Sequence, residues 1–354
     1  MYPMMRTTGL VGGAAIFLVT VCSCVTPVAS KPAGATTVKA VPDWVTNPGR
    51  RYPSAHYLVA VGAGDSRRAA EDNAVAGLAR IFESKIDSEE TLVEQYRELM
   101  GASGNRFEAR SEMDQRVRIQ AKQELLNVQF GDCVIDSMGR AYIIAYMERQ
   151  PTAGVYRKRV EENEAAVKRF AARADAAGDA PTCYAFRQAA WVVARANQGY
   201  VQQLDILQPG SAARHDPGYT VDGLKTAAHD AARALRIGIA VDGDEGGELA
   251  EAVTAAITEL GFSVVTSDPV WRLKASLRIE PANLARGDAQ FVRYECAVSV
   301  MQGDATIMGT TGAGREGHIS LQGARQRAVT RACGDIRTQL KSGLQQYFGR
   351  LTQE

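Results

Sequence analysis

The C-terminal third of the chain has the most regular pattern of hydrophobic and polar residues. From Trp271 to Glu280, apolar residues occupy every second position, and charged or small polar residues stand between them. The segment 291–301 has the same period. Successive side chains of a strand point to opposite faces, so this period predicts antiparallel strands that are buried on one face and solvated on the other.

Helical periods surround these strands. In residues 248–260 the apolar residues recur at helical spacing, and Gly261 follows, where a helix C-cap favours glycine. The expected elements are helix 220–234, strand 237–241, helix 248–260, strands 262–266, 271–280, 291–301 and 305–311, and a terminal helix from Gly323. After the first helix, the order β-α-β-β-β-β-α predicts a C-terminal domain, residues 220–354, with its helices on one face of a sheet.

Two further parts precede this domain. Residues 154–208 predict an antiparallel helical hairpin, because two helix-period segments are broken at Gly178-Asp179-Ala180-Pro181; Asn163 interrupts the first apolar stripe. Residues 42–150 predict a domain with strand 57–61, a helix capped by Ser66, a charged helix at 108–126, and a hairpin of strands 127–136 and 141–147 turned at Gly139. The predicted fold class is α+β, with two small α/β-sandwich-like domains, antiparallel or mixed sheets with helices on one face, joined by a helical hairpin.

The sequence Gly62-Ala63-Gly64 raises the question of a cofactor loop, because an apolar strand leads into it and a helix follows. A dinucleotide-binding turn has a third glycine three residues after the second, which allows close packing of helix and strand. This chain has Arg67 at that position. The pattern therefore indicates a tight strand-to-helix turn, and no cofactor is expected.

The N-terminus predicts export and lipidation. An apolar run from Gly9 to Val21 is too short to span a bilayer but suits the core of a secretory signal. It ends in VCSC, residues 21–24, which resembles the cleavage box of bacterial lipoproteins, and Cys24 fits best because the small Ser23 precedes it. We expect a signal peptide at 1–23 and acylation of Cys24, for example by palmitate. An ordinary signal sequence and a short core helix are the alternatives.

The segment after the signal predicts where the folded part is held. Residues 24–41 are rich in Ala, Thr and Pro and lack apolar periodicity, which is typical of a flexible tether. Val25, rather than Asp, after the acylated cysteine favours the outer membrane under the sorting rule of enteric bacteria. The expected location is the cell envelope, with a lipid anchor in the outer membrane and the protein facing the periplasm.

Charge and metal-binding residue types exclude several functions. Lys plus Arg total 41 and Asp plus Glu 40, a net charge of +1, so no nucleic-acid partner is expected. The four histidines are dispersed and no CxxC occurs, so no metal site is expected. The acidic, glycine-rich segment 241–248 lacks the ligand spacing of a calcium loop and predicts a turn into a helix.

Two groups of residues are candidates for chemistry or contact. Cys296 and Cys333 are both expected between sheet and helix, where a disulfide and two free buried thiols are equally weighted alternatives. The segment 310–320 predicts a flexible polar loop between the last strand and the terminal helix. In that loop Arg315, Glu316 and His318 are candidates for contact with a partner, and a merely solvated loop is the alternative.

Several motifs of the first domain resemble the LPP-twenty family of small bacterial surface lipoproteins. The matching features are Pro42-x-Trp44, YLVAVGAGDS from Tyr57, the alanine-rich helix that follows, and the charged, strand-like ESKIDSEET at 83–91. Related modules occur in the N-terminal part of flagellar assembly protein T. The resemblance extends through the hairpin at 139–147 and implies a cell-envelope lipoprotein. The family has no established catalytic residues, so none is assigned.

These patterns favour a non-enzymatic envelope lipoprotein that acts as a structural or protein-interaction module. Its expected partners are the membrane, through its N-terminal lipid, and envelope proteins or peptidoglycan-associated machinery. The alternative is a periplasmic carrier that binds a small or lipidic ligand between sheet and helix. An enzyme with an unrecognised site is the least favoured class, because no catalytic motif is found.

Overall fold

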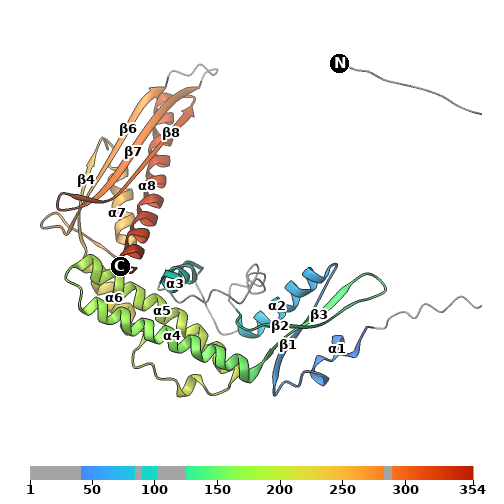
Figure 1. Cartoon of the computed structure of the whole chain (residues 1–354). Helices are drawn as coiled ribbons and strands as arrows, with labels where there is room; N and C mark the ends of the chain where they lie inside the picture. The colour runs from blue at the N-terminus through green and yellow to red at the C-terminus, as the bar shows by residue number, and fades with distance from the viewer. Residues whose placement is uncertain (1–40, 84–89, 103–124, 283–288, 354) are drawn as a thin grey trace, which may run out of the picture. The chain divides into compact units, whose positions relative to one another are not determined.

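The computed structural model describes residues 41–83, 90–102, 125–282 and 289–353 (Figure 1). The chain from Ala40 onward forms one unit. In the described ranges, no helix combines the length and the apolarity needed to cross a bilayer. The predicted signal peptide and tether, including Cys24, and nearly all of the predicted helix 108–126 lie outside the described residues.

Three antiparallel strands form the first sheet, in the order β1-β3-β2. The strands are β1 (Tyr57–Gly64), β2 (Gln129–Ile135) and β3 (Ala141–Glu148), and they follow helix α1 (Asp43–Thr46) and the 3-10 helix η1 (Pro48–Arg50). The predicted hairpin of β2 and β3 is confirmed. Its turn contains Gly139 with a φ of +83°, a conformation that glycine adopts at low cost.

Helix α2 (Arg67–Glu83) packs on β1 and β3. Ala70 and Leu78 of this helix are fully buried. At the start of the helix, the N–H of Ala69 donates a hydrogen bond to Ser66 Oγ at 3.2 Å, as the predicted cap requires.

Gly62 lies inside β1 and serves the packing of α2. A Cβ atom on Gly62 would lie 2.0 Å from the carbonyl oxygen of Ala70 and 2.3 Å from the backbone nitrogen of Ala74. The sequence interpretation placed this glycine in a turn, whereas the structure shows that close approach of helix and strand requires it.

The predicted helical hairpin is confirmed as α4 (Arg149–Asp175) and α5 (Ala180–Leu207). Asp179 caps α5 by accepting a hydrogen bond from the N–H of Thr182 at 2.8 Å. The polar Asn163 of α4 is fully buried, and its Nδ2 donates to Asn197 Oδ1 of α5 at 3.0 Å. This hydrogen bond pairs the two polar groups inside the hairpin and so accounts for the interrupted stripe.

Helix α3 (Glu90–Ala102) was not predicted from the sequence. Most of the charged, strand-like segment 83–91 of the family resemblance, residues 84–89, lies outside the described residues. The helix packs against α5, with Leu92 and Tyr96 buried. The hydroxyl of Tyr96 also donates to Asn163 Oδ1 at 2.9 Å. Packing of its apolar side against α5 therefore stabilises this helix.

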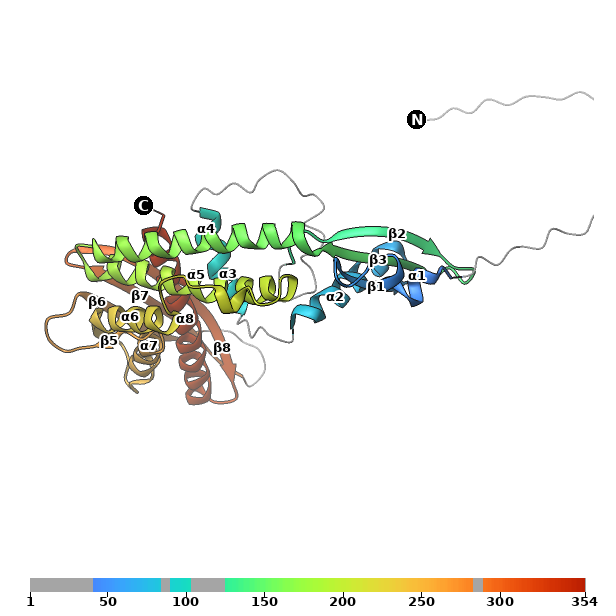
Figure 2. The same cartoon turned by 90° about the horizontal axis from the view of Figure 1, so that it is seen from below.

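The C-terminal part has the predicted element order. The elements are η3 (Ala212–Arg214), α6 (Val221–Ala234), β4 (Arg236–Asp242), α7 (Glu248–Glu259), β5 (Ser263–Val264), β6 (Trp271–Ala282), β7 (Gln290–Gln302), β8 (Ala305–His318) and α8 (Leu321–Leu351). The sheet order is β5-β4-β6-β7-β8; β4 runs parallel to β5 and β6, and the other neighbours are antiparallel. Helices α7 and α8 cover one face of this sheet (Figures 1 and 2).

The helical hairpin of α4 and α5 contributes to two hydrophobic cores. One core joins the first sheet and α2 to α4 and α5, and the other fills the space between the second sheet and its helices. The ring of Tyr184 on α5 lies 5.1 Å from Phe262 and 4.7 Å from Phe348 in the second core, measured between ring centroids. The structure is thus of the α+β class, as predicted.

The substitution Gly62→Ala should destabilise the protein by about 3 kcal/mol, because the added methyl group meets backbone atoms of α2 that cannot move without separating helix and sheet. Gly154→Ala is the matched control, since a Cβ at this position of α4 meets nothing within 4 Å. That variant should be about 0.5–1 kcal/mol more stable. Denaturant unfolding followed by circular dichroism measures both, and equal stability of Gly62→Ala and the wild type would contradict the close approach.

Candidate functional site

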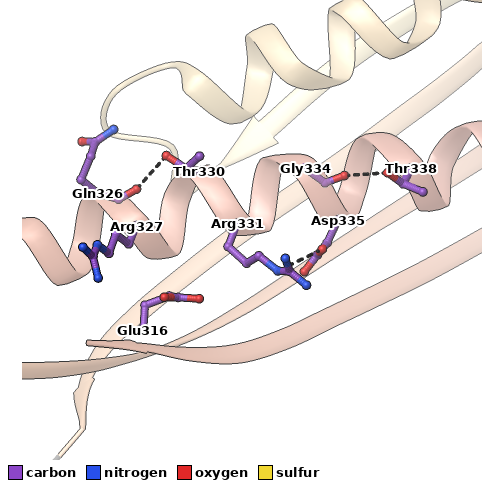
Figure 3. Close-up of a pocket in the computed structure, with 8 residues that line it drawn as sticks. All are labelled: Glu316, Gln326, Arg327, Thr330, Arg331, Gly334, Asp335 and Thr338. Carbon is purple, nitrogen blue, oxygen red and sulfur yellow. Dashed lines mark hydrogen bonds and ion pairs between the residues drawn. The ribbon is translucent and has the colours of Figure 1, made fainter. Parts of the chain in front are cut away.

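A groove of about 610 Å³ lies between the edge strand β8 and helix α8 (Figure 3). Its lining combines one carboxylate of β8 with polar side chains along one side of α8. The lining residues are Glu316, Gln326, Arg327, Thr330, Arg331, Gly334, Asp335 and Thr338. The groove is open and charged, so it suits a polar ligand or a segment of another protein more than an enclosed small molecule.

Small residues on β8 allow this groove to form. Gly312 and Gly314 face α8 and pair in register with Cys296 and Tyr294 of β7. A Cβ atom on Gly314 would lie 2.6 Å from the hydroxyl oxygen of Tyr294. Because the glycine has no side chain, the tyrosine extends across β8 and reaches the helix.

Tyr294 holds two charged side chains of α8 in place, Asp335 directly and Arg331 through Asp335. Its hydroxyl donates a hydrogen bond to Asp335 Oδ2 at 3.1 Å, and Arg331 Nε lies 3.4 Å from Asp335 Oδ1. Burial, followed by the hydrogen bond to Asp335, raises the pKa of Tyr294 above its usual value, so the phenol stays protonated and can donate. Asp335 and Arg331 are therefore already engaged with each other and with the sheet.

Arg327 and Glu316 are the less constrained charges of the groove. Arg327 Nη1 donates to the backbone oxygen of Gly317 at 3.1 Å, which leaves most donors of its guanidinium unused by that bond. Glu316 is half-buried and faces the two arginines in Figure 3. Among the described residues, Glu316 has no hydrogen bond or ion pair.

A second hollow of about 490 Å³ adjoins the groove at the end of β8. Its lining is Ala289, Phe291, Gly317, His318, Ile319 and Arg327. Ile319 is 82% exposed, so this hollow offers apolar surface that the described residues leave uncovered. Arg327 lines both depressions.

The predicted loop at 310–320 is wrong, because β8 continues to His318. Arg315, Glu316 and His318 therefore lie on a strand that pairs with β7 along its whole length. The high glycine content suggested a loop, but in this strand glycines are required by the large side chains of β7 beside them.

The structure separates the three predicted contact residues. Arg315 is exposed on the outer face of the sheet, opposite Arg293 of β7, whereas Glu316 points toward α8 and lines the groove. His318 lies at the connection between β8 and α8, where its Nδ1 accepts a hydrogen bond from the N–H of Ser320 at 3.2 Å. Ser320 in turn caps α8 by accepting from the N–H of Gly323 at 3.2 Å.

Arg327, Arg331 and Asp335 were not among the residues predicted from the sequence. Their spacing of four residues places them on one side of α8, directly beside the buried stripe formed by Ala328, Ala332 and Ile336. A row of charged residues at this spacing next to an apolar stripe is the signal that could have identified them.

Cys296 and Cys333 are both free thiols in the structure, as are Cys133 and Cys183. Cys296 Sγ lies 3.4 Å from the carbonyl oxygen of Gly312, to which it donates. Burial raises the pKa of both Cys296 and Cys333, in the case of Cys333 to about 11, with a further contribution from Asp244. A thiol with so high a pKa is a poor nucleophile at neutral pH.

The acidic segment 241–248 forms a helix cap, as predicted. The Asp244 carboxylate accepts hydrogen bonds from the N–H of Leu249 at 3.2 Å and of Ala250 at 2.8 Å. Within the part of the chain that the structure describes, no group of three or more His, Cys, Asp or Glu side chains is arranged to hold a metal ion.

No family model matches the chain, and no curated protein matches it. Among solved structures it is similar to the secreted protein HP1454 of Helicobacter pylori, with 11% identity, a TM-score of 0.43, and 80% of this chain and 97% of that chain covered. It is also similar to a minor lipoprotein of Acinetobacter baumannii, with 11% identity, a TM-score of 0.25, and 32% of this chain and 91% of that chain covered.

Rare lipoprotein B of Shewanella oneidensis is a further similar structure, with 13% identity, a TM-score of 0.23, and 31% of this chain and 91% of that chain covered. The similar structures named here are thus a secreted protein and two lipoproteins of bacteria. At these identities and TM-scores the likeness is distant and transfers no function to this chain.

The Cys333 thiol should react slowly with iodoacetamide, because a pKa of about 11 leaves roughly a thousandth of it as thiolate at pH 8. The rate should rise about tenfold for each pH unit between 7 and 10. Peptide mass spectrometry measures the modification, with the chain unfolded in guanidinium as the control. Reaction at pH 8 as fast as in the unfolded chain would contradict the burial. Modification that requires prior reduction would instead show a disulfide.

Proposed function

We propose that this protein is a lipid-anchored lipoprotein of the bacterial cell envelope and that it acts, without enzymatic activity, as a docking module for other envelope components. The single observation that carries the proposal is Cys24 within VCSC at the end of an apolar run. Acylation of this cysteine by several chains would give durable anchoring, whereas one chain would be marginal.

The groove between β8 and α8 supports a docking role. It is open, and its charged side chains come from a strand and a helix that are fixed to each other, in part by the hydrogen bond from Tyr294 to Asp335. A site built on rigid elements can present the same surface to a partner each time. The groove and the adjoining hollow together offer both charged and apolar surface.

The carrier function is less well supported by the same domain. It would require ligand space between the second sheet and its helices, and buried side chains occupy that region, including Trp271 from β6, Val253 from α7 and Leu340 from α8. We therefore favour a surface that binds partners over a cavity that encloses a ligand.

The finer assignments are part of the proposal. We propose the LPP-twenty family for the first domain, on the Pro42-x-Trp44 and YLVAVGAGDS motifs. We also propose the outer membrane as the site of anchoring, on Val25. Envelope proteins or peptidoglycan-associated machinery are the proposed partners, because a tether of residues 24–41 would hold the folded part close to the membrane.

Metabolic labelling with palmitate tests the anchor. The wild type should incorporate label and fractionate with membranes, whereas Cys24→Ser should lose both properties because the acceptor thiol is gone. Cys22→Ser is the matched control, two residues earlier in the same segment, and should keep the label. Labelling that persists in Cys24→Ser, or that is lost in Cys22→Ser alone, would contradict the assignment of Cys24.

A further inference from the structure

Strand β8 forms one edge of the second sheet. Its inner edge pairs with β7 from Gln302↔Ala305 to Gln290↔His318, over 14 residues of β8. No described strand pairs with its outer edge. The opposite edge of the sheet is β5, which has only 2 residues. The backbone N–H and C=O groups that point away from β7 are therefore concentrated along one long strand.

Long free edges are hazards that proteins usually protect with lysine, proline or bulges. The 14 residues of β8 include no lysine and no proline, and Gly, Ala and Thr predominate. The described shift in its register with β7 lies between Thr306 and Met308, away from Gly312 to His318. Side chains engage two carbonyls of β8 through described hydrogen bonds: Arg327 Nη1 binds that of Gly317, and Cys296 Sγ binds that of Gly312. Along most of its length the edge offers little steric obstacle to another strand.

Two depressions for side chains lie at the end of this edge. Glu316 pairs with Val292 and lines the groove on the α8 face. Gly317 and Phe291 form the next pair and line the hollow, together with His318 and with Arg327 of α8. An extended segment added here would have both depressions within reach of its side chains, and pockets of this kind give strand addition its specificity.

The charges and apolar groups at the edge define the chemistry of the segment. Arg327 lines both depressions and retains unused donors, and Arg315 projects from the outer face nearby. Glu316 is the one carboxylate of the groove without a partner among the described residues, since Asp335 is bound by Tyr294 and Arg331. The net charge of these side chains at the edge is positive, and Phe291 and Ile319 add apolar surface in the hollow.

We propose that the free edge of β8 near Gly312 to His318 takes up an extended segment of a partner protein as a sixth strand. A carboxylate of that segment binds Arg327, and an apolar side chain enters the hollow beside Phe291 and Ile319. This inference rests on the proposed docking function and names the mode of docking and the kind of partner.

A second copy of the chain fits this edge less well. Symmetric antiparallel pairing of two β8 strands centred on this segment would bring the Arg315 side chains of both copies to the same face of the sheet. It would also bring both Arg327 side chains to the interface between the two copies. Like charges directly across strands are destabilising. An acidic segment from a different protein removes this repulsion.

A displayed library of random peptides of about ten residues, selected on the full-length protein in detergent micelles, provides the probe. Selected peptides should carry an Asp or Glu within an alternating apolar pattern. Binding of the best peptide should slow hydrogen exchange of backbone amides in β8. Arg327→Ala should lower the affinity for that peptide by about tenfold or more, since the substitution removes a charge-assisted hydrogen bond.

Arg325→Ala is the matched control, because Arg325 is an exposed arginine of the same helix that lines neither depression. It should change the affinity by less than about twofold. Two N-methylated forms of the peptide, each blocking alternate amides, then test the backbone pairing. One form should lose binding and the other keep it, because only alternate amides of an added strand donate to the edge.

Several results would overturn the proposal. They are no enriched peptide, protection confined to residues outside β8, equal binding of both N-methylated forms, and equal loss in the two arginine variants. A dimer of the protein alone with protected β8 amides would assign the edge to a second copy. Failure here is distinguishable from failure of the anchor, because palmitate labelling of Cys24 does not depend on β8.

Discussion

The close packing of α8 onto β8 and β7 is the constraint on which the candidate site depends. It is possible only because β8 has no side chain at Gly312 and Gly314, where Cys296 and Tyr294 occupy the space. With a larger residue at Gly314, Tyr294 could not reach Asp335, and Asp335 and Arg331 would lose this connection to the sheet. The first sheet has a similar feature, since the missing side chain of Gly62 leaves room for the backbone of α2. In both sheets glycine is needed because a Cβ atom would collide with a neighbouring group.

This use of glycine explains which parts of the fold the sequence could predict. The two-residue period of β6 and β7 and the stripes of α7 and α8 reflect which face is buried, so they predicted the C-terminal elements correctly. The extent of β8 was missed because a strand of small residues has no hydrophobic period. Its structure is determined by pairing with β7, and a local pattern of residues does not show that pairing. Helix α3, by contrast, does carry a readable signal, because Leu92, Tyr96, Leu99 and Met100 recur at helical spacing; it was missed because the charged segment before it drew attention away from that period.

The candidate site was only partly predictable. Glu316 was selected for its place in an expected loop, and it does line the groove, although on a strand. Arg327, Arg331 and Asp335 looked like the solvated side of a long helix, and only the tertiary structure shows that this side faces the edge of a sheet. Cys296 and Cys333 were correctly expected between sheet and helix, whereas their redox state follows from no sequence pattern.

The helical hairpin is part of both cores. Buried residues of α4 and α5 join the first core, and Tyr184 at the start of α5 packs against Phe262 and Phe348 of the second. Phe348 lies on α8, the helix that carries the groove. A partner that shifts α8 would therefore meet resistance from α5, since closely packed aromatic contacts do not deform gradually. The groove accordingly behaves as a rigid surface more than as an adaptable one.

Under the proposed anchoring, rigidity and tethering together would make weak strand addition sufficient for docking. A rigid edge loses little conformational entropy when a segment binds, whereas the extended partner segment must be ordered at some cost. An anchor at Cys24 would confine the edge near the membrane, and a partner in the same envelope would meet it at a high effective concentration. Modest affinity for one short segment then gives substantial occupancy. Copies on the same membrane would be concentrated in the same way, so repulsion between the Arg315 side chains and between the Arg327 side chains is what would limit edge-to-edge pairing of this chain with itself.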